Sequence, residues 1–365
     1  MLIVDAHEDL AWNMLALSRD YTRSAAETRR LEAAAGTRDY NGDTLLGYAE
    51  YQRGRVALVF GTLFAAPQRL TEDTWDTQVY SDVAQANRIY RNQLGAYQRL
   101  VEEHPDQFRL VLGKNSLQGV IAPWKADNEQ DSQDKPVGIV VLMEGAEGVQ
   151  SPDELEDWWE QGVRLIGLAW AGNRFCGGTR EPGPLTREGF ALLEGMAGMG
   201  FILDLSHMDE QAALQALDAY PGAIVATHAN AKSLLPGTDS NRHLSDRLIQ
   251  GLIERDGVVG VVPYNAFLQA GWRKGDPRQA ISLQRVVAQI DWICQLAGDA
   301  RHAGLGTDFD GGFGVQSVPA EIDTIADLQQ LAPLLAAKGY SSLDIAAILG
   351  QNWLDRLEQH LPAGL

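Results

Sequence analysis

Short apolar runs that are rich in Val, Ile and Leu recur along the chain and predict β-strands. Most of these runs are continuously apolar, not alternating, which is typical of strands covered on both faces, as in a parallel sheet. The eight clear runs cover residues 2–5, 56–64, 138–144, 165–170, 201–206, 223–227, 258–264 and 303–308, and a ninth over 108–112 is shorter and ambiguous.

Helical patterns lie between the apolar runs. Ser151, Pro152 and Glu154 have the spacing of a capping box with proline at the first helical position. Residues 208–220 form an amphipathic pattern that predicts another helix. Further helix N-caps are expected at Ser245, at Ser282 and at Ser341 or Ser342.

Eight strands that alternate with helices predict the α/β class and a (β/α)8 TIM barrel, here a single domain over residues 1–365. A doubly wound open sheet is the structural alternative. The sequence has no GxGxxG after the first strand and no GxxxxGK[ST], which disfavours a nucleotide-binding sheet.

Three segments are expected to be loops. Residues 20–41 are charged and Ala-rich, with a ragged helix as the alternative, and residues 123–136 are strongly polar, which indicates a surface insertion. Residues 172–184 are dense in Gly and Pro and follow the fourth predicted strand. In a barrel that position lies on the catalytic face.

Composition narrows the range of partners. The 365 residues include 49 Asp and Glu against 30 Lys and Arg, a formal net charge of −19, which argues against nucleic acid and anionic membranes as partners. Cys176 and Cys294 form no disulfide framework and are expected to serve packing. The absence of a secretion-signal pattern and of a long apolar span leads us to expect a cytoplasmic protein. A homodimer stays open, with Trp158 and Trp159 as candidate contact residues and helix packing as the alternative.

Residues of metal-ligand type collect at the carboxyl ends of the apolar runs, which a barrel brings to one rim. His7 and Asp9 share one side of an extended segment and could hold one cation, while His207 and His228 follow successive strands and could hold a second. Glu144 could bridge the two. Imidazole and carboxylate ligands suit zinc, with other divalent first-row metals as alternatives, and two such ions would share a hydroxide and polarise a carbonyl. The alternative for each histidine is a hydrogen-bonded structural role.

Two further residues are candidates for chemistry. Asp308 follows the last strand and could carry a proton from water to a leaving amine, with a structural hydrogen bond as the alternative. Arg242 could clamp a substrate carboxylate, with a surface arginine as the alternative. The remaining polar residues singled out are expected to be structural (Asp5 and Glu8), a ligand or turn cap (Asp310), or exposed (His104, His302 and His360).

Several motifs together resemble the renal (membrane) dipeptidase family of the amidohydrolase superfamily. In chain order they are DAHEDLAW at 5–12, MEGAEG at 143–148, ILDLSH at 202–207, ATH at 226–228, NRH at 241–243, GTDFDG at 306–311 and GQNWLDRLE at 350–358. They lie within residues 1–360 and so cover nearly the whole chain.

The resemblance implies a di-zinc barrel hydrolase that cleaves dipeptides, including dipeptides with a C-terminal D-residue. It implies that Glu144 bridges the two zinc ions, that Arg242 holds the substrate carboxylate and that Asp308 handles protons. Tyr264 and Asn265 lie where this family lines its substrate pocket. The remaining ligands implied are His7 and Asp9 for one ion, and His207 and His228 for the other.

Two positions depart from the family pattern. Trp170 stands where the family has a histidine that contacts the scissile carbonyl, and indole donates one hydrogen bond but carries no proton. Glu147, where the family often has histidine, adds negative charge and could favour a cationic substrate group. The leading hypothesis is therefore a zinc-dependent dipeptidase. The alternatives are hydrolysis of another small amide, lactam or N-acyl amino acid, or a weakly active or non-catalytic metal-binding barrel.

Overall fold

Eight parallel strands form the centre of the protein in this computed structural model, which describes residues 1–71, 75–126 and 134–364. Their side chains are buried along almost the entire length of each strand, as expected for a sheet covered on both faces. The strands are β1 (Ile3–Glu8), β2 (Val56–Leu63), β6 (Val137–Met143), β7 (Val163–Gly167), β10 (Ile202–Asp204), β11 (Ile224–Val225), β12 (Val259–Val261) and β13 (Ala303–Leu305).

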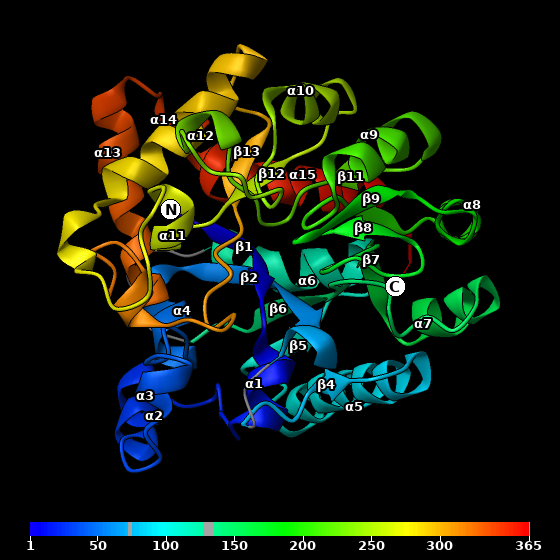
Figure 1. The fold of residues 1–365 in the computed structure, drawn as a ribbon. Coiled ribbons are helices and arrows are strands. Elements are labelled where there is room, and N and C mark those ends of the chain that lie inside the picture. Colours follow the sequence, from blue (N-terminus) through cyan, green and yellow to red (C-terminus); the bar gives the residue numbers. More distant parts are fainter. Residues whose placement is uncertain (72–74, 127–133, 365) are drawn as a thin grey trace.

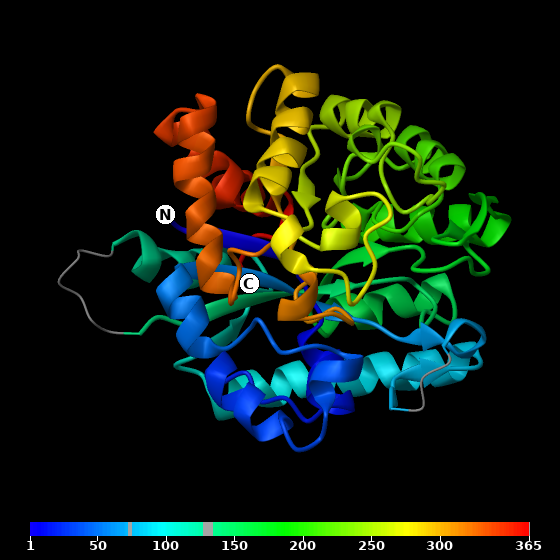
Figure 2. The ribbon, with the colours of Figure 1, turned by 60° about the vertical axis from the view of Figure 1, so that its left-hand side comes forward.

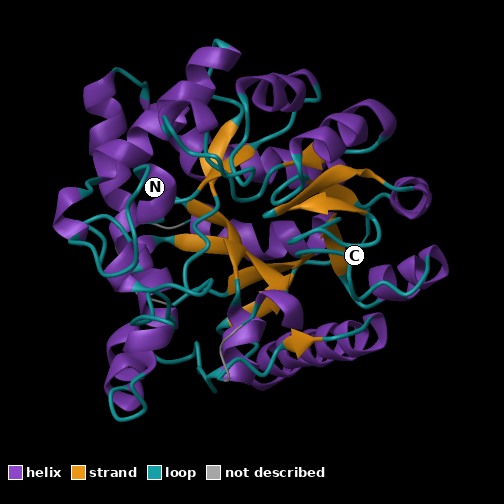
Figure 3. Ribbon diagram, viewed as in Figure 1, coloured by secondary structure: helices purple, strands orange, loops and turns teal. Residues whose placement is uncertain are grey.

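The strand order curves the sheet into a nearly closed barrel. Neighbours follow the order β11-β10-β7-β6-β2-β1-β13-β12, and a single parallel bridge between Ala226 and Val259 joins the two ends. Figures 1 and 3 show the strands at the centre with helices around them. The predicted (β/α)8 barrel is confirmed and the doubly wound open sheet is not observed. The ambiguous ninth run forms β5 (Phe108–Leu110), which pairs with the first residues of β6, off the barrel path.

Helices surround the barrel. In Figure 2, blue α2 and cyan α5 lie on one side of the sheet, and yellow α12 and orange α13 lie on the opposite side. Among the described residues, no helix combines the length and the apolar character needed to cross a bilayer. The helices are α1 (Leu10–Ala16), α2 (Ala25–Glu32), α3 (Thr37–Tyr40), α4 (Tyr48–Gly54), α5 (Val83–Glu103), α6 (Lys114–Lys125), α7 (Leu155–Glu160), α8 (Arg187–Met199), α9 (Glu210–Ala219), α10 (Asp246–Glu254), α11 (Asn265–Leu268), α12 (Leu283–Ala297), α13 (Leu331–Lys338), α14 (Ser342–Ala346) and α15 (Asn352–His360).

Most helix starts agree with the sequence. Ser245 caps α10 by accepting from the Leu248 amide, and Ser341 forms a capping box with Asp344 at α14. Ser282 precedes α12 as expected but makes no side-chain cap. The predicted box at Ser151 is wrong, because Glu154 there accepts from the amides of Gln150 and Asn87. A 3-10 turn (Pro152–Glu154) replaces the first helical turn before α7.

The three expected loops contain more regular structure than the sequence indicated. Residues 20–41 contain α2 and α3. In the segment 123–136, Pro123 lies inside α6, and residues 127–133 lie outside the described residues. Residues 172–184 largely form an antiparallel hairpin of β8 (Cys176–Gly178) and β9 (Glu181–Leu185). A second small sheet pairs β3 (Ala66–Pro67) with β4 (Val79–Tyr80). The hairpin brings the segment after β7 over the carboxyl ends of the strands.

A buried ion pair anchors the loop that follows β13. Asp310 is fully buried, lies 2.9 Å from Arg19 (Nη1) and accepts hydrogen bonds from Tyr21, Thr44 and the Leu45 amide. Because a buried carboxylate must be paired to be tolerated, these contacts hold the loop against the N-terminal segments. Asp310 is therefore a structural anchor and contacts the protein on several sides, which is more than the expected turn cap.

Candidate metal centre and substrate pocket

The side chains predicted as metal ligands converge beyond the carboxyl ends of the strands. His7 is the next-to-last residue of β1 and Asp9 directly precedes α1, whereas Glu144, His207 and His228 follow β6, β10 and β11. One carboxylate oxygen of Glu144 lies 3.4 Å from His7 Nε2, and the other lies 3.1 Å from His207 Nε2 and 3.3 Å from His228 Nε2. Glu144 thus lies between His7 on one side and the pair of His207 and His228 on the other.

Two sets of potential ligand atoms share Glu144. One set is His7, Asp9 and Glu144, the other is Glu144, His207 and His228, and within each set the atoms lie within 4.8 Å of one another. The division between the two sets follows the pairs expected from the sequence.

The Thr227 hydroxyl orients two of the three histidines. It donates to Asp204 Oδ2 at 2.5 Å, so its oxygen is left to accept from His228 Nδ1 at 3.1 Å and His7 Nδ1 at 3.4 Å. This network assigns the ring proton of each histidine to Nδ1. The Nε2 atoms of His7 and His228 therefore face Glu144, where a cation or a second ring proton would be held.

Two other threonines contact two of the remaining candidate ligands, His207 and Asp9. Thr179, at the tip of the β8–β9 hairpin, contacts His207 Nδ1 at 2.9 Å and can donate its own proton to the His207 carbonyl. Thr62 on β2 donates to Asp9 through a short hydrogen bond. Hydroxyl groups behind the ligands fix ring orientation and raise metal affinity in metalloproteins.

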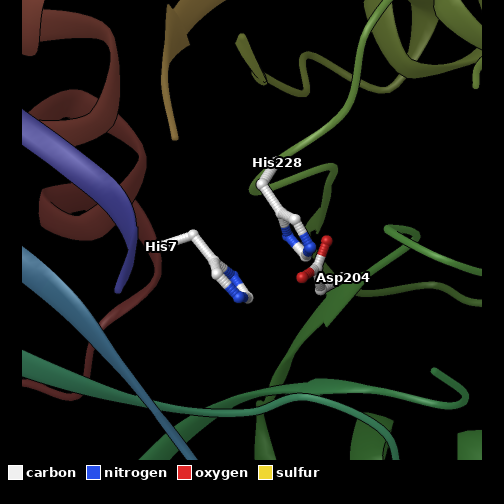
Figure 4. Close-up of side chains that lie close together, drawn as sticks. All are labelled: His7, Asp204 and His228. Carbon is white, nitrogen blue, oxygen red and sulfur yellow. The ribbon is translucent and has the colours of Figure 1, made fainter. Parts of the chain in front are cut away.

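A third group of potential ligands is His7, Asp204 and His228, which Figure 4 shows side by side. The Asp204 carboxylate is already occupied, because it accepts from the Ser206 hydroxyl at 2.7 Å and the Thr227 amide at 2.9 Å, besides the Thr227 hydroxyl. It also lies on the Nδ1 side of the histidines. We therefore assign Asp204 to orienting the ligands and not to binding a cation.

The cluster carries an excess of buried negative charge. Burial alone would lower the pKa of His7, but Glu144, Asp9 and Asp308 together raise it to about 9. Burial, followed by the charge of Glu144, raises the pKa of Asp9 to about 7. Burial also raises the pKa of Asp308 well above its usual value, with Asp9 and Glu144 adding to the rise. The centre therefore stabilises positive charge, either as protons or as bound cations.

The residues present fit divalent metal ions. His207 Nε2 and His228 Nε2 face each other at 2.9 Å, and the buried His7 Nε2 has no hydrogen-bond partner among the described residues. Two imidazole lone pairs at this distance repel unless an electrophile lies between or beside them. Nitrogen and carboxylate donors in this number are typical of zinc and related first-row metals.

Asp308 lies at the edge of the cluster with its side chain 15% exposed, the highest exposure among the acidic residues there. Its Oδ1 is 3.9 Å from His7 Nε2. The residue adopts a left-handed backbone (φ 58°), as does His207 (φ 68°). Such a backbone is costly for residues other than glycine and persists at functional sites where the surroundings impose it.

Arg242 is buried with unpaired donors. Its Nη2 donates to the His228 carbonyl at 2.6 Å, but Nε and Nη1 have no partner in the described part of the chain. Burial lowers the pKa of its guanidinium, and the nearby charges of Asp308 and Glu144 offset only part of this effect. In turn, burial and the charge of Arg242 lower the pKa of His207 to about 3, which keeps that ring neutral. Unpaired buried guanidinium donors mark a place where an anionic group can bind.

A pocket of about 320 Å³ opens directly onto the cluster. Trp170, expected at the scissile carbonyl, lines this pocket, and its ring centroid is 5.9 Å from that of His207. Arg242, Tyr264 and Asn265 do not belong to its lining. Tyr264 stacks on Phe313, and Asn265 is fully buried and donates to the Val318 carbonyl at 3.1 Å. The complete lining is Asp9, Trp12, Tyr40, Phe64, Ala66, Trp75, Glu144, Trp170, His207, Lys274, Asp308, Gly311 and Gly312.

Two expectations about single residues change. His302 was expected at the surface but is buried, with Nδ1 2.8 Å from the Gly257 carbonyl, because it lies directly before β13. Glu147 does not line the pocket. Its carboxylate accepts from Asn173 at 3.0 Å and Tyr90 at 3.3 Å, and burial raises its pKa to about 7. It therefore belongs to the protein interior and offers nothing to a substrate amine.

Other residues behave as their surroundings require. Asp5 accepts from Thr307, and Glu8 accepts from Tyr51, so both are structural as expected. Trp158 is fully buried, and the partly buried Trp159 packs edge-on against Phe201, while a homodimer contact at these residues stays a prediction. The remaining residues expected at the surface or in packing agree, with His104 and His360 partly exposed and Cys176 and Cys294 buried as free thiols.

The residues behind the ligands were not identified from the sequence. Thr62, Thr179 and Thr227 are ordinary residues for strands and loops, and only their contacts distinguish them. Asp204 carried a usable signal, because a charged residue within the apolar run at 201–206 has to be paired when it is buried. Its i+2 relation to Ser206, on the same side of the strand, was the second clue.

Comparison with known proteins agrees with the motif resemblance. The family model described as membrane dipeptidase (peptidase family M19) matches residues 1–360. An uncharacterised protein from the pqqA 5′ region of Klebsiella pneumoniae is 32% identical over 276 residues, 73% of this chain and 94% of that protein. The dipeptidase ataJ of Aspergillus terreus is 27% identical over 353 residues, 88% of this chain and 79% of that protein. An uncharacterised dipeptidase of Schizosaccharomyces pombe is 31% identical over 221 residues, but only about half of that protein is spanned (51%, against 58% of this chain).

Solved structures support the fold. An M19 metallopeptidase named dipeptidase AC superposes with a TM-score of 0.78 at 23% identity, covering 100% of this chain and 99% of that one. A metallopeptidase from Rhodobacter sphaeroides, solved with a phosphinate mimic of L-Ala-D-Ala, gives 0.76 at 22% identity with 99% of both chains covered. The barrel is thus shared along the full chain. Together with the match over residues 1–360, which also confirms the expected enzyme class, this shows that the chain belongs to the membrane dipeptidase family, peptidase family M19.

Proposed function

We propose that this chain, as a single barrel domain over residues 1–365, hydrolyses dipeptides with the help of two divalent metal ions, zinc being the preferred one. The observation that carries the proposal is the pair of ligand sets that share Glu144. His7 and Asp9 complete one set, and His207 and His228 complete the other. When bound, such ions would polarise the amide carbonyl and lower the pKa of a water molecule between them.

Asp308 has the position and exposure of a proton carrier. Its carboxylate faces the pocket beside Glu144, and it can accept a proton from the attacking water and deliver it to the leaving amine. Proton transfer of this kind requires hydrogen-bond reach to the reacting groups, and the position of Asp308 in the pocket lining beside Asp9 and Glu144 is consistent with it.

Arg242 has the free donors to bind the substrate carboxylate. Its unpaired Nε and Nη1 atoms can each donate a hydrogen bond to an anionic group such as a carboxylate. This recognition depends on the carboxylate and not on the configuration of the neighbouring carbon, so substrates with a C-terminal D-residue fit the proposal. The Rhodobacter sphaeroides protein with its L-Ala-D-Ala mimic gives further support.

Trp170 is the reason why functions other than efficient dipeptide hydrolysis stay open. Indole cannot take over proton transfer from a histidine, and losing one oxyanion donor typically lowers kcat by about 10²–10³-fold. A dipeptidase that is slowed in this way, an enzyme for another small amide and a non-catalytic metal-binding barrel are distinguished by turnover. We would assay metal-loaded protein on L,L- and L,D-dipeptides, N-acyl amino acids and lactams. Turnover of dipeptides by protein fully stripped of metal would contradict the proposal.

Replacing a ligand should remove metal together with activity. Wild-type protein is expected to bind about two zinc ions per chain, and His7→Ala or His207→Ala to lose about one of them, since each histidine belongs to one ligand set. Glu144→Gln should weaken the binding of both zinc ions, because Glu144 belongs to both ligand sets. Metal per chain is measured by mass spectrometry of the dialysed protein. His360→Ala, at a partly exposed histidine of α15, is the control and should keep its metal. Unchanged metal content in all three ligand variants would contradict the assignment.

Thr227 should matter for both ions, because its single hydroxyl contacts a histidine of each set. Thr227→Val should lower metal affinity about 10- to 100-fold, as for other residues that orient ligands. Thr227→Ser keeps the hydroxyl and should retain affinity near the wild-type value. Both affinities are measured by competition with a chelator. Equal affinities for the two variants would show that the hydroxyl does not set the ligand geometry.

Asp308→Asn tests the proton carrier. The variant should keep its metal, because Asp308 belongs to neither ligand set, and its kcat should fall about 10²–10⁴-fold. Steady-state kinetics and metal analysis on the same preparation separate these effects. A kcat within a few-fold of the wild type would assign Asp308 a structural role instead.

Arg242→Met tests recognition of the carboxylate. Wild-type protein should prefer a dipeptide over its C-terminal amide, and the variant should lose about 10- to 100-fold of that preference in kcat/KM, the usual effect of hydrogen bonds to a charged group. Arg242→Lys keeps a charge and should retain part of the preference. Because the ratio compares two substrates on one protein, a general loss of stability does not imitate the effect. An unchanged ratio would place the carboxylate elsewhere.

A further inference from the structure

Aromatic rings form one side of the pocket that opens onto the metal-ligand cluster. We call this side the aromatic wall, made of Trp12, Phe64, Trp75 and Trp170. The ring centroids of Trp12 and Trp75 are 5.5 Å apart, those of Trp12 and Phe64 are 6.1 Å apart, and those of Phe64 and Trp170 are 5.4 Å apart. The rings meet edge to face, an arrangement that leaves a continuous apolar surface.

The aromatic wall is built separately from the main core. Trp12, Phe64 and Ala66 form their own small buried cluster, against which Trp75 and Trp170 pack while partly buried. These residues come from segments that follow three different strands: β1, β2 and β7. Large aromatic side chains that remain partly exposed beside a reactive centre are typical of a site that binds an apolar group.

The size of the pocket suits a large side chain. Its volume of about 320 Å³ exceeds the roughly 150 Å³ that suffices to hold benzene in an engineered protein cavity. At the rim, the Lys274 ammonium donates to the Tyr40 carbonyl at 2.7 Å. The carboxylates of Asp9, Glu144 and Asp308 line the same pocket at the cluster.

The barrel order determines which residue of a dipeptide enters this pocket. Arg242 follows β11, whereas the aromatic wall follows β1, β2 and β7, and in the strand order β10 and β11 lie beyond β7. Only β10, which precedes His207, lies between β7 and β11 in this order. Trp170 of the aromatic wall lies beside His207, whereas Arg242 donates to the carbonyl of His228 on the far side of His207. If the C-terminal carboxylate binds Arg242 and the scissile carbonyl lies at the cluster, the N-terminal residue lies against the aromatic wall.

We propose that the aromatic wall selects dipeptides whose N-terminal residue carries a large apolar side chain, preferably an aromatic one. This inference rests on the proposed dipeptidase function. It gives Trp170 a role in binding, in the place where the family histidine is expected to act on the carbonyl. The fit of an aromatic side chain against four aromatic rings supplies binding energy that smaller residues lack.

The test compares Phe-Ala, Ala-Phe and Ala-Ala as substrates of the metal-loaded protein. Phe-Ala and Ala-Phe have the same composition, so their ratio reports only which position takes the large side chain. We expect kcat/KM for Phe-Ala to exceed that for both other dipeptides by about 10-fold or more, the scale on which hydrophobic pockets discriminate. Phe64→Leu and Trp170→Leu should each reduce the ratio of Phe-Ala to Ala-Ala.

Phe190→Leu is the matched control, because Phe190 is an aromatic residue of α8 with 42% exposure and lies outside the pocket lining. This variant should keep the wild-type ratio. Equal kcat/KM values for Phe-Ala and Ala-Ala, or a preference for Ala-Phe, would overturn the inference while leaving the dipeptidase function intact.

Binding separates this inference from failure of the proposed function. Phosphinate analogues of Phe-Ala and Ala-Phe are titrated into the metal-loaded protein by calorimetry. If no dipeptide is hydrolysed but the Phe-Ala analogue binds about 10-fold more tightly than the Ala-Phe analogue, the aromatic wall selects the N-terminal side chain as proposed and the dipeptidase function is wrong. Equal binding of the two analogues would contradict the aromatic wall's role whether or not hydrolysis occurs.

Discussion

The mutual repulsion of buried carboxylates is the constraint on which this site depends. Asp9, Glu144 and Asp308 come from three different strand ends and meet where little water can screen them. Only positive charge makes this arrangement stable, which is why the pKa of His7 rises to about 9 in its vicinity. Bound cations would satisfy the same requirement, so the charge excess and the ligand geometry point to the same chemistry.

The barrel supports this centre with two equivalent contacts, each between a buried aspartate and a threonine that follows the neighbouring strand. Asp5 on β1 accepts from both the amide and the hydroxyl of Thr307, which follows β13, and Asp204 on β10 does the same with Thr227, which follows β11. Each pair ties two neighbouring strands together at their carboxyl ends. In each case the residue after the threonine, Asp308 or His228, enters the cluster. In each pair the buried structural carboxylate holds the threonine and thereby positions the functional residue that follows that threonine in the chain.

The substitution of Trp170 is more than the loss of a histidine. The indole packs on Phe64 and lies beside His207, so it extends an apolar surface up to the metal-ligand cluster. In the proposed function, the Trp170 indole offers apolar contact area to the substrate where the family histidine would carry a proton at the scissile carbonyl. This connects the departure from the family pattern with the choice of substrate, and it explains why a chain with a complete set of candidate ligands can carry an aromatic residue at this place.

The sequence by itself determined the barrel and the first layer of the site, because continuously apolar runs and ligand-type residues at their ends are local patterns. His7, Asp9, Glu144, His207 and His228 could be named and paired in this way, although metal binding by these residues stays a prediction. The tertiary structure alone decided the second layer. Thr227 and Asp204 act through contacts between strands, and the burial of His302 and the separation of Tyr264 from the pocket depend on packing. The aromatic wall likewise joins residues from distant segments, whose proximity no local pattern encodes.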